Sequence, residues 1–223
     1  MLLAFSVSAL AQTELPPFDI SKVPAVANKP DDFAQKGWKV EEVVKGDLNG
    51  DGKTDAAIKL AQIEEGREGG GIGGDRALVV VFDDGGKWKR VAVSAGILQC
   101  VDCGGAFYGV MPAPAGLTID KGVIVVENEH GSRNVDTSTF RFRYDKASGR
   151  FILVGYDFVD NDRNTGAWVN ESTNYSTNKR VTKSGKGKRS SSKTAVIKPT
   201  KIYIEDASQD DLEGEALHRN GLD

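Results

Sequence analysis

Residues 47–55, with the sequence DLNGDGKTD, have the residue types and spacing of a calcium-binding loop. Calcium takes about six to eight oxygen ligands, so a short loop must direct several oxygens at one point. A glycine at position six, Gly52, permits the necessary turn. The sequence therefore predicts one Ca²⁺ ion held by side-chain oxygens at positions one, three, five and nine and by the carbonyl at position seven: Asp47, Asn49, Asp51, Asp55 and Lys53.

The flanks of this loop indicate strands and not helices. Apolar side chains recur on one side of residues 38–44. In residues 56–60, Ala56, Ile58 and Leu60 alternate with Ala57 and Lys59. A helix-loop-helix calcium hand would also need a bidentate glutamate at position twelve, where this chain has Ile58. The expected unit is a strand, a calcium loop and a second strand.

Residues 38–60 resemble the FG-GAP and VCBS repeats of integrin-type propellers and of many secreted bacterial proteins. In those repeats the calcium loop lies between two strands of one blade. The resemblance implies that the ion at Asp47, Asn49, Asp51, Lys53 and Asp55 supports the structure. This chain carries one copy of the loop, whereas the family repeats it around a ring. A solvated turn without metal is the alternative, because Asp, Asn and Gly favour turns on their own.

The rest of the chain predicts hairpins in sequence. Short apolar runs flank turns rich in Gly, Asp and Lys at residues 77–93, 117–126 and 139–154, and the chain has 26 glycines. Residues 139–144 alternate apolar and polar side chains, which is typical of a strand with one buried face. We expect a mainly β fold, a sequential antiparallel meander that forms a curved sheet, a sandwich or a small propeller-like body. A propeller of six or seven blades needs a longer chain.

Four segments are expected along the 223 residues. Residues 1–11 are apolar and end in an Ala-x-Ala pattern, which predicts a signal peptide without its positively charged start. Residues 12–36 read as a linker with a short helix near residues 30–37, residues 37–204 as the β domain with its calcium loop, and residues 205–223 as an acidic tail. No stretch of the mature chain is long and apolar enough to cross a membrane. The expected location is the periplasm or the cell exterior.

Cys100 and Cys103 are the only cysteines of the chain. Their spacing suits a redox dithiol, half of a zinc site or a structural disulfide. Two glycines and no helical pattern follow, and the only histidines are His130 and His218, with His218 in the expected tail. In an oxidising compartment a disulfide that pins a loop is therefore favoured.

Catalytic patterns are sparse, so the sequence does not identify an enzyme. His130 and Ser132 stand close together without a nucleophile elbow, and a surface turn is the default interpretation. Asp157, Asp160 and Asp162 could act as acid and base or hold a second cation, although a solvated loop is favoured. An exported hydrolase built on these residues remains an alternative. The glycines of residues 69–74 match a dinucleotide fingerprint, but they precede a strand and not a helix.

Residues 179–201 contain basic and no acidic side chains, although the formal net charge of the chain is −3. A polyanion could bind there, at Lys186, Lys188 and Arg189 above all. Nucleic acid is disfavoured as a partner, because no aromatic side chain that could stack on bases is interleaved. The sequence favours a calcium-binding interaction module, whose ligand would be an unidentified protein or glycan.

Overall fold

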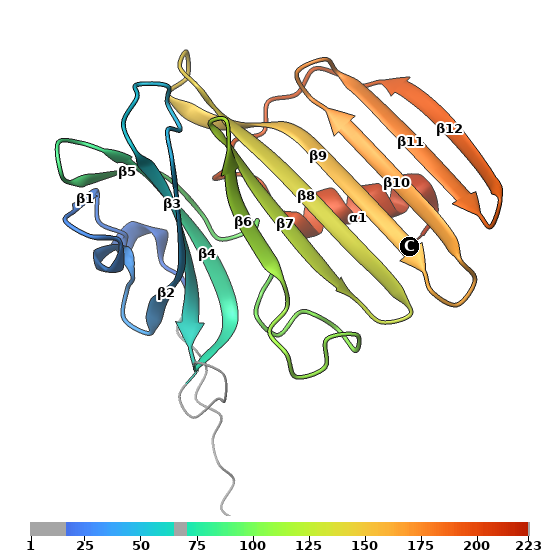
Figure 1. Cartoon of the computed structure of the whole chain (residues 1–223), viewed down its shortest axis with the longest axis horizontal. Coiled ribbons are helices and arrows are strands. Elements are labelled where there is room, and N and C mark those ends of the chain that lie inside the picture. Colours follow the sequence, from blue (N-terminus) through green and yellow to red (C-terminus); the bar gives the residue numbers. More distant parts are fainter. Residues whose placement is uncertain (1–16, 65–70, 223) are drawn as a thin grey trace, which may run out of the picture.

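The computed structural model describes residues 17–64 and 71–222. The expected signal peptide, residues 1–11, lies outside the described residues. Two antiparallel sheets make up most of the fold (Figure 1). The five-stranded sheet has the order β1 (Val26–Ala27), β5 (Trp88–Ser94), β4 (Ile72–Asp83), β3 (Asp55–Ile63) and β2 (Trp38–Gly46). The seven-stranded sheet has the order β12 (Arg189–Val196), β11 (Lys179–Lys186), β10 (Ala167–Asn174), β9 (Arg150–Asp162), β8 (Asn134–Asp145), β7 (Val123–Gly131) and β6 (Ala115–Asp120).

The prediction of a mainly β fold with a sequential meander is confirmed, since strands that follow one another in the chain are paired in each sheet, except β1, which pairs with β5. Each expected hairpin is present, as β4 with β5, β6 with β7 and β8 with β9. The architecture combines two of the expected forms, because the seven-stranded sheet is curved and packs against the smaller one.

The main core lies between the sheets and the C-terminal segment. Alternation along the strands directs one face of each sheet into it. Its largest fully buried side chains are aromatic and come from the central strands β8 and β9: Phe140, Phe142, Phe151, Tyr156 and Phe158. The opposite face of the five-stranded sheet forms a second core around Ile58, Leu60 and Val79. Strand β3 is buried on both faces because it lies between these cores.

The second core corrects the interpretation of residues 12–36 as a linker. Val23, Ala27 and Phe33 are buried against the five-stranded sheet, and the Phe18 ring packs edge-on against Trp38. The expected short helix is present as a 3-10 turn, η2 (Pro30–Phe33), and another, η1 (Ile20–Lys22), precedes it. The segment covers an apolar sheet face that water would otherwise contact, and this burial stabilises it.

The C-terminal segment also differs from expectation. Helix α1 (Gln209–Asn220) lies across the seven-stranded sheet (Figure 1), so the interpretation of residues 205–223 as an acidic tail is wrong. The Ser208 hydroxyl accepts a hydrogen bond from the Asp211 N–H at the start of α1, and Gly221 ends it in the left-handed conformation. Leu212 and Ala216 are buried in the main core. No helix among the described residues is long and apolar enough to span a membrane.

Candidate calcium loop and a buried polar cluster

The candidate calcium loop connects β2 to β3, as the sequence predicts. Gly50 and Gly52 have φ values of 76° and 81°, which side chains rarely tolerate. The chain can therefore wrap around Asp47, whose carboxylate accepts hydrogen bonds from the N–H groups of Gly50 at 2.7 Å and Gly52 at 2.9 Å. These bonds hold the pKa of Asp47 below its usual value, and the bond from Gly52 contributes most.

The exposed side of the loop carries the next two predicted ligands. The Asn49 Oδ1 atom accepts from the Asp51 N–H at 2.8 Å, and the Asp51 Oδ1 atom accepts from the Lys53 N–H at 2.8 Å. Both side chains thus bond within the loop and remain accessible to solvent. Each bonded oxygen keeps a further lone pair for a cation.

Asp55, the ninth residue, is fully buried. Its Oδ2 atom accepts from the Leu48 N–H at 2.9 Å, and its Oδ1 atom accepts from the Asp83 N–H at 3.0 Å. Burial raises the pKa of Asp55, and the nearby charges of Asp51 and Asp47 raise it further. Three carboxylates gathered in this way favour a divalent ion, and no ion pair with a basic side chain is found for them within the described residues.

The donors fit calcium by type, since all are hard oxygens. The carboxylates of the loop do not converge as tightly as a second group in the described part of the chain. The ligand atoms of that group, His130, Asp136 and Glu213, all lie within 4.8 Å of one another. Binding of an ion at the loop would therefore require its three carboxylates to move closer together.

The loop lies where the two sheets meet. Leu48 is 3 % exposed and packs in the main core. Two glycines show how close the loop lies to the larger sheet. If Gly122, in the turn between β6 and β7, had a Cβ atom, that atom would lie 3.2 Å from the Asp47 carbonyl oxygen. A Cβ atom at Gly50 would lie 3.6 Å from the Nζ atom of Lys146, in the turn between β8 and β9. The loop at the end of the smaller sheet thus lies close to turns of the larger sheet.

A second polar site occupies the inner face of the seven-stranded sheet. On β7, β8 and β9 every second side chain faces inward, and beyond the aromatic core these inward-facing side chains are polar. They are Asn128, His130, Asn134, Asp136, Ser138, Asp160 and Asp162. Asp136 and Asp160 are directly paired across β8 and β9. Helix α1 adds Gln209 and Glu213 over this end of the sheet.

The charges within this cluster are strongly coupled. The His130 Nε2 atom and the Glu213 Oε1 atom lie 2.5 Å apart, and this bond raises the pKa of His130. Burial opposes ionisation of Glu213, yet hydrogen bonds from His130, Gln209 and Ser138 outweigh it and lower the pKa. Burial, followed by the adjacent Asp160 carboxyl, raises the pKa of Asp136 to about 7.

The structure separates Ser132 and Asp157 from the other residues that were considered for a hydrolase. Ser132 is exposed, and no hydrogen bond joins it to His130 within residues 17–64 and 71–222. Asp157 faces away from the cluster and pairs with Arg141 at 2.7 Å. Asp160 and Asp162 lie on the inner face of β9, so the interpretation of this stretch as a solvated loop is wrong. His130 instead joins two carboxylates, Asp136 and Glu213, that sequence reasoning missed.

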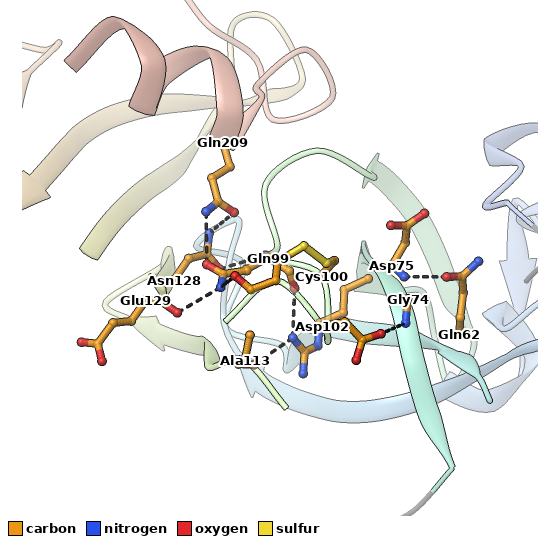
Figure 2. Close-up of a disulfide and its surroundings, with 12 residues drawn as sticks. Gln62, Gly74, Asp75, Gln99, Cys100, Asp102, Ala113, Asn128, Glu129 and Gln209 are labelled. Carbon is orange, nitrogen blue, oxygen red and sulfur yellow. Dashed lines mark hydrogen bonds between the residues drawn. A yellow bond between two sulfur atoms is a disulfide. The ribbon is translucent and has the colours of Figure 1, made fainter. Parts of the chain in front are cut away.

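Cys100 and Cys103 form a disulfide with Cα atoms 5.2 Å apart, in the connection between the sheets. Figure 2 shows the amide side chains around it. Gln99 donates from Nε2 to the carbonyls of Cys103 and Glu129, and its N–H donates to the Asn128 Oδ1 atom. Gln209 on α1 accepts from the Asn128 Nδ2 atom at 3.0 Å. This network ties the disulfide loop and β7 to the start of α1.

The disulfide and the polar cluster border the same hollow. A cavity of about 490 Å³ is lined by Cys100, Cys103, His130, Gln209 and Glu213, among others. His130 and Glu213 are therefore reachable from solvent on one side, whereas Ser138 behind them is buried.

Comparisons with protein-family models, with curated proteins and with solved structures found no match.

Proposed function

We propose that this chain is an exported calcium-binding β module in which one ion at Asp47, Asn49, Asp51, Lys53 and Asp55 locks the contact between two sheets. The observation that carries the proposal is the position of the loop. Asp55 and Leu48 anchor it in buried surroundings, while Asn49 and Asp51 stay accessible on its outer side. Neutralising three carboxylates there would remove a repulsion that opposes the folded arrangement.

The disulfide and the resemblance to FG-GAP and VCBS loops support a periplasmic or secreted location. Calcium is abundant outside the cytoplasm, where weak sites with Kd values of about 10⁻⁴ to 10⁻³ M are sufficient. Its role here is structural, and the module would bind a protein or glycan ligand. A groove lined by Trp168, Asp162, Lys186 and Arg189, among others, offers the aromatic and charged side chains that such ligands contact.

The experiment compares Asp51→Asn with the parent protein in chelator and in about 10 mM calcium. If Kd is about 10⁻⁴ M, this calcium concentration adds about 2.7 kcal/mol of stability. We expect it to raise the Tm of the parent by about 5–10 °C. D51N should be at least as stable as the parent in chelator, because Asp51 is exposed and its charge repels that of Asp55, and it should gain much less in calcium.

The matched control is Asp84→Asn, which removes an exposed carboxylate from the turn between β4 and β5. It should respond to calcium like the parent. Equal calcium shifts in D51N and the parent would disprove the proposed site, whereas a reduced shift in D84N would indicate only a general charge effect.

A second function, polyanion binding, is favoured by the hairpin of β11 and β12. Every charged residue from Lys179 to Val196 is basic, and β12 is exposed along nearly its whole length. Replacing Lys186, Lys188 and Arg189 with Gln should weaken binding of inorganic polyphosphate and flatten its salt dependence. The same change at Lys22, Lys29 and Lys36 is the control. Equal affinity of the two triple variants would exclude the hairpin as the binding surface.

A further inference from the structure

We infer that His130, Asp136 and Glu213 form a binding site for a divalent transition metal ion of the zinc type. The site is separate from the proposed calcium loop and does not depend on it. Its three ligands come from β7, β8 and α1, and one ligand atom of each lies within 4.8 Å of the other two. Zinc bonds of about 2.0–2.2 Å separate two ligand atoms by at most about 4.4 Å, so small side-chain movements suffice.

An unsatisfied atom points to a ligand at this position. The Asp136 Oδ1 atom is buried and has no hydrogen-bond partner. A buried acceptor without a partner costs about 1–3 kcal/mol. The ion pair of His130 and Glu213 leaves this oxygen unsatisfied, whereas a cation held between the three side chains would satisfy it.

Neighbouring residues already hold one of the ligands, Glu213, in place. The Glu213 Oε2 atom accepts hydrogen bonds from the Ser138 hydroxyl at 3.2 Å and from the Gln209 Nε2 atom at 3.4 Å. Asp160, opposite Asp136, accepts from the Asn134 Nδ2 atom at 2.7 Å. Such outer contacts orient metal ligands and limit the reorganisation that binding requires.

The donor set selects the type of ion. One imidazole nitrogen and two carboxylates suit zinc and related transition metals, whereas calcium prefers oxygen ligands alone. Two carboxylates also balance the charge of one divalent ion. Because His130 and Glu213 border the cavity of about 490 Å³, the ion would have an open side for water as its fourth ligand.

The test is zinc binding by chelator-treated protein, followed by calorimetry and by metal analysis after gel filtration. We expect one zinc ion per chain. His130→Gln and Asp136→Asn should each weaken binding by about tenfold or more. Cobalt bound to the parent should give the visible absorption bands of a four-coordinate site. The D136N variant should lack these bands.

Two control variants isolate the site. His218→Gln removes the other histidine of the chain, and D51N removes a ligand of the calcium loop. Both should bind zinc like the parent, so a failure of the calcium proposal would leave this result unchanged. D136N is nearly isosteric and remains informative if H130Q does not fold. Absence of stoichiometric zinc in the parent, or unchanged affinity in a folded D136N variant, would overturn the inference.

Discussion

At the scale of single residues, strand alternation decides which carboxylates interact with the cluster on the inner face. Asp157 and Asp162 both belong to β9, but only Asp162 lies on the inner side, at its rim. The Arg133 Nη2 atom lies 2.7 Å from the Asp162 Oδ2 atom, and the N–H groups of Asn164 and Thr165 donate to the Asp162 Oδ1 atom. These contacts stabilise the ionised form and hold the pKa of Asp162 far below its ordinary value.

Arg133→Gln should raise the pKa of Asp162 towards 3.8, its ordinary value, because the bond to Arg133 is the largest cause of the shift. A lowered pKa means that the stabilising contribution is present above pH 3.8 and is lost as pH falls below it. R133Q should therefore show less loss of stability on acidification. An NMR titration of the Asp162 carboxyl measures the pKa directly. Arg163→Gln is the control, and an unchanged titration in R133Q would refute the assignment.

At the scale of elements, the strands could be predicted because their signal is local. Residues 139–144 alternate within β8, and the turns carry the expected Gly and Asp residues. Helix α1 could not be predicted from apolar pattern, since it buries little beyond Leu212 and Ala216 and has an acidic first turn. Only its end signals, Ser208 and Gly221, were available in the sequence.

The calcium loop and the cluster around His130 also differ in how far the sequence alone predicts them. The proposed calcium ligands lie within nine consecutive residues, so their spacing alone predicts a calcium site. His130 and Glu213 are 83 residues apart in the chain and meet only after α1 packs on β7. Extending the alternation of β8 backwards from Phe140 places Asp136 on the inner face, but no local signal identifies its partners.

Leu212→Ala should test whether α1 belongs to the cooperative fold. Leu212 is buried in the main core, and truncating a buried leucine costs about 2–5 kcal/mol. Glu215→Ala, on the exposed side of α1, removes only a pair with Arg219 and should cost about 0.5 kcal/mol or less. Urea unfolding curves measure both. Similar midpoints for the two variants would mean that α1 adds little to global stability.

At the scale of the whole molecule, the contact between the sheets depends on connections as well as on the core. The buried Arg76 guanidinium on β4 donates to the carbonyls of Gln99 and Ala113 in the crossing from β5 to β6, and it pairs with Glu41 on β2 at 2.7 Å. Near the calcium loop, Leu48 enters the core between the sheets. The ligands of the proposed ion are therefore positioned by packing against the seven-stranded sheet, which links calcium affinity to the assembly of the fold.

Leu48→Ala should weaken calcium binding as well as the fold. Losing the Leu48 side chain should cost about 2–5 kcal/mol of stability and free the loop from the core. Binding must then order the loop again at about 1–2 kcal/mol per residue, so affinity should fall by about tenfold or more. Calorimetric titration of calcium into folded protein at low temperature measures this effect.

Leu60→Ala is the matched control, because Leu60 is equally buried but belongs to the second core on the other face of β3. It should lose comparable stability and keep the calcium affinity of the parent, since its cavity opens away from the loop. Equal calcium affinities for L48A and L60A would show that packing of the loop against the larger sheet does not position the ligands. A selective loss in L48A would establish that the ion and the contact between the sheets stabilise each other, as thermodynamic linkage requires.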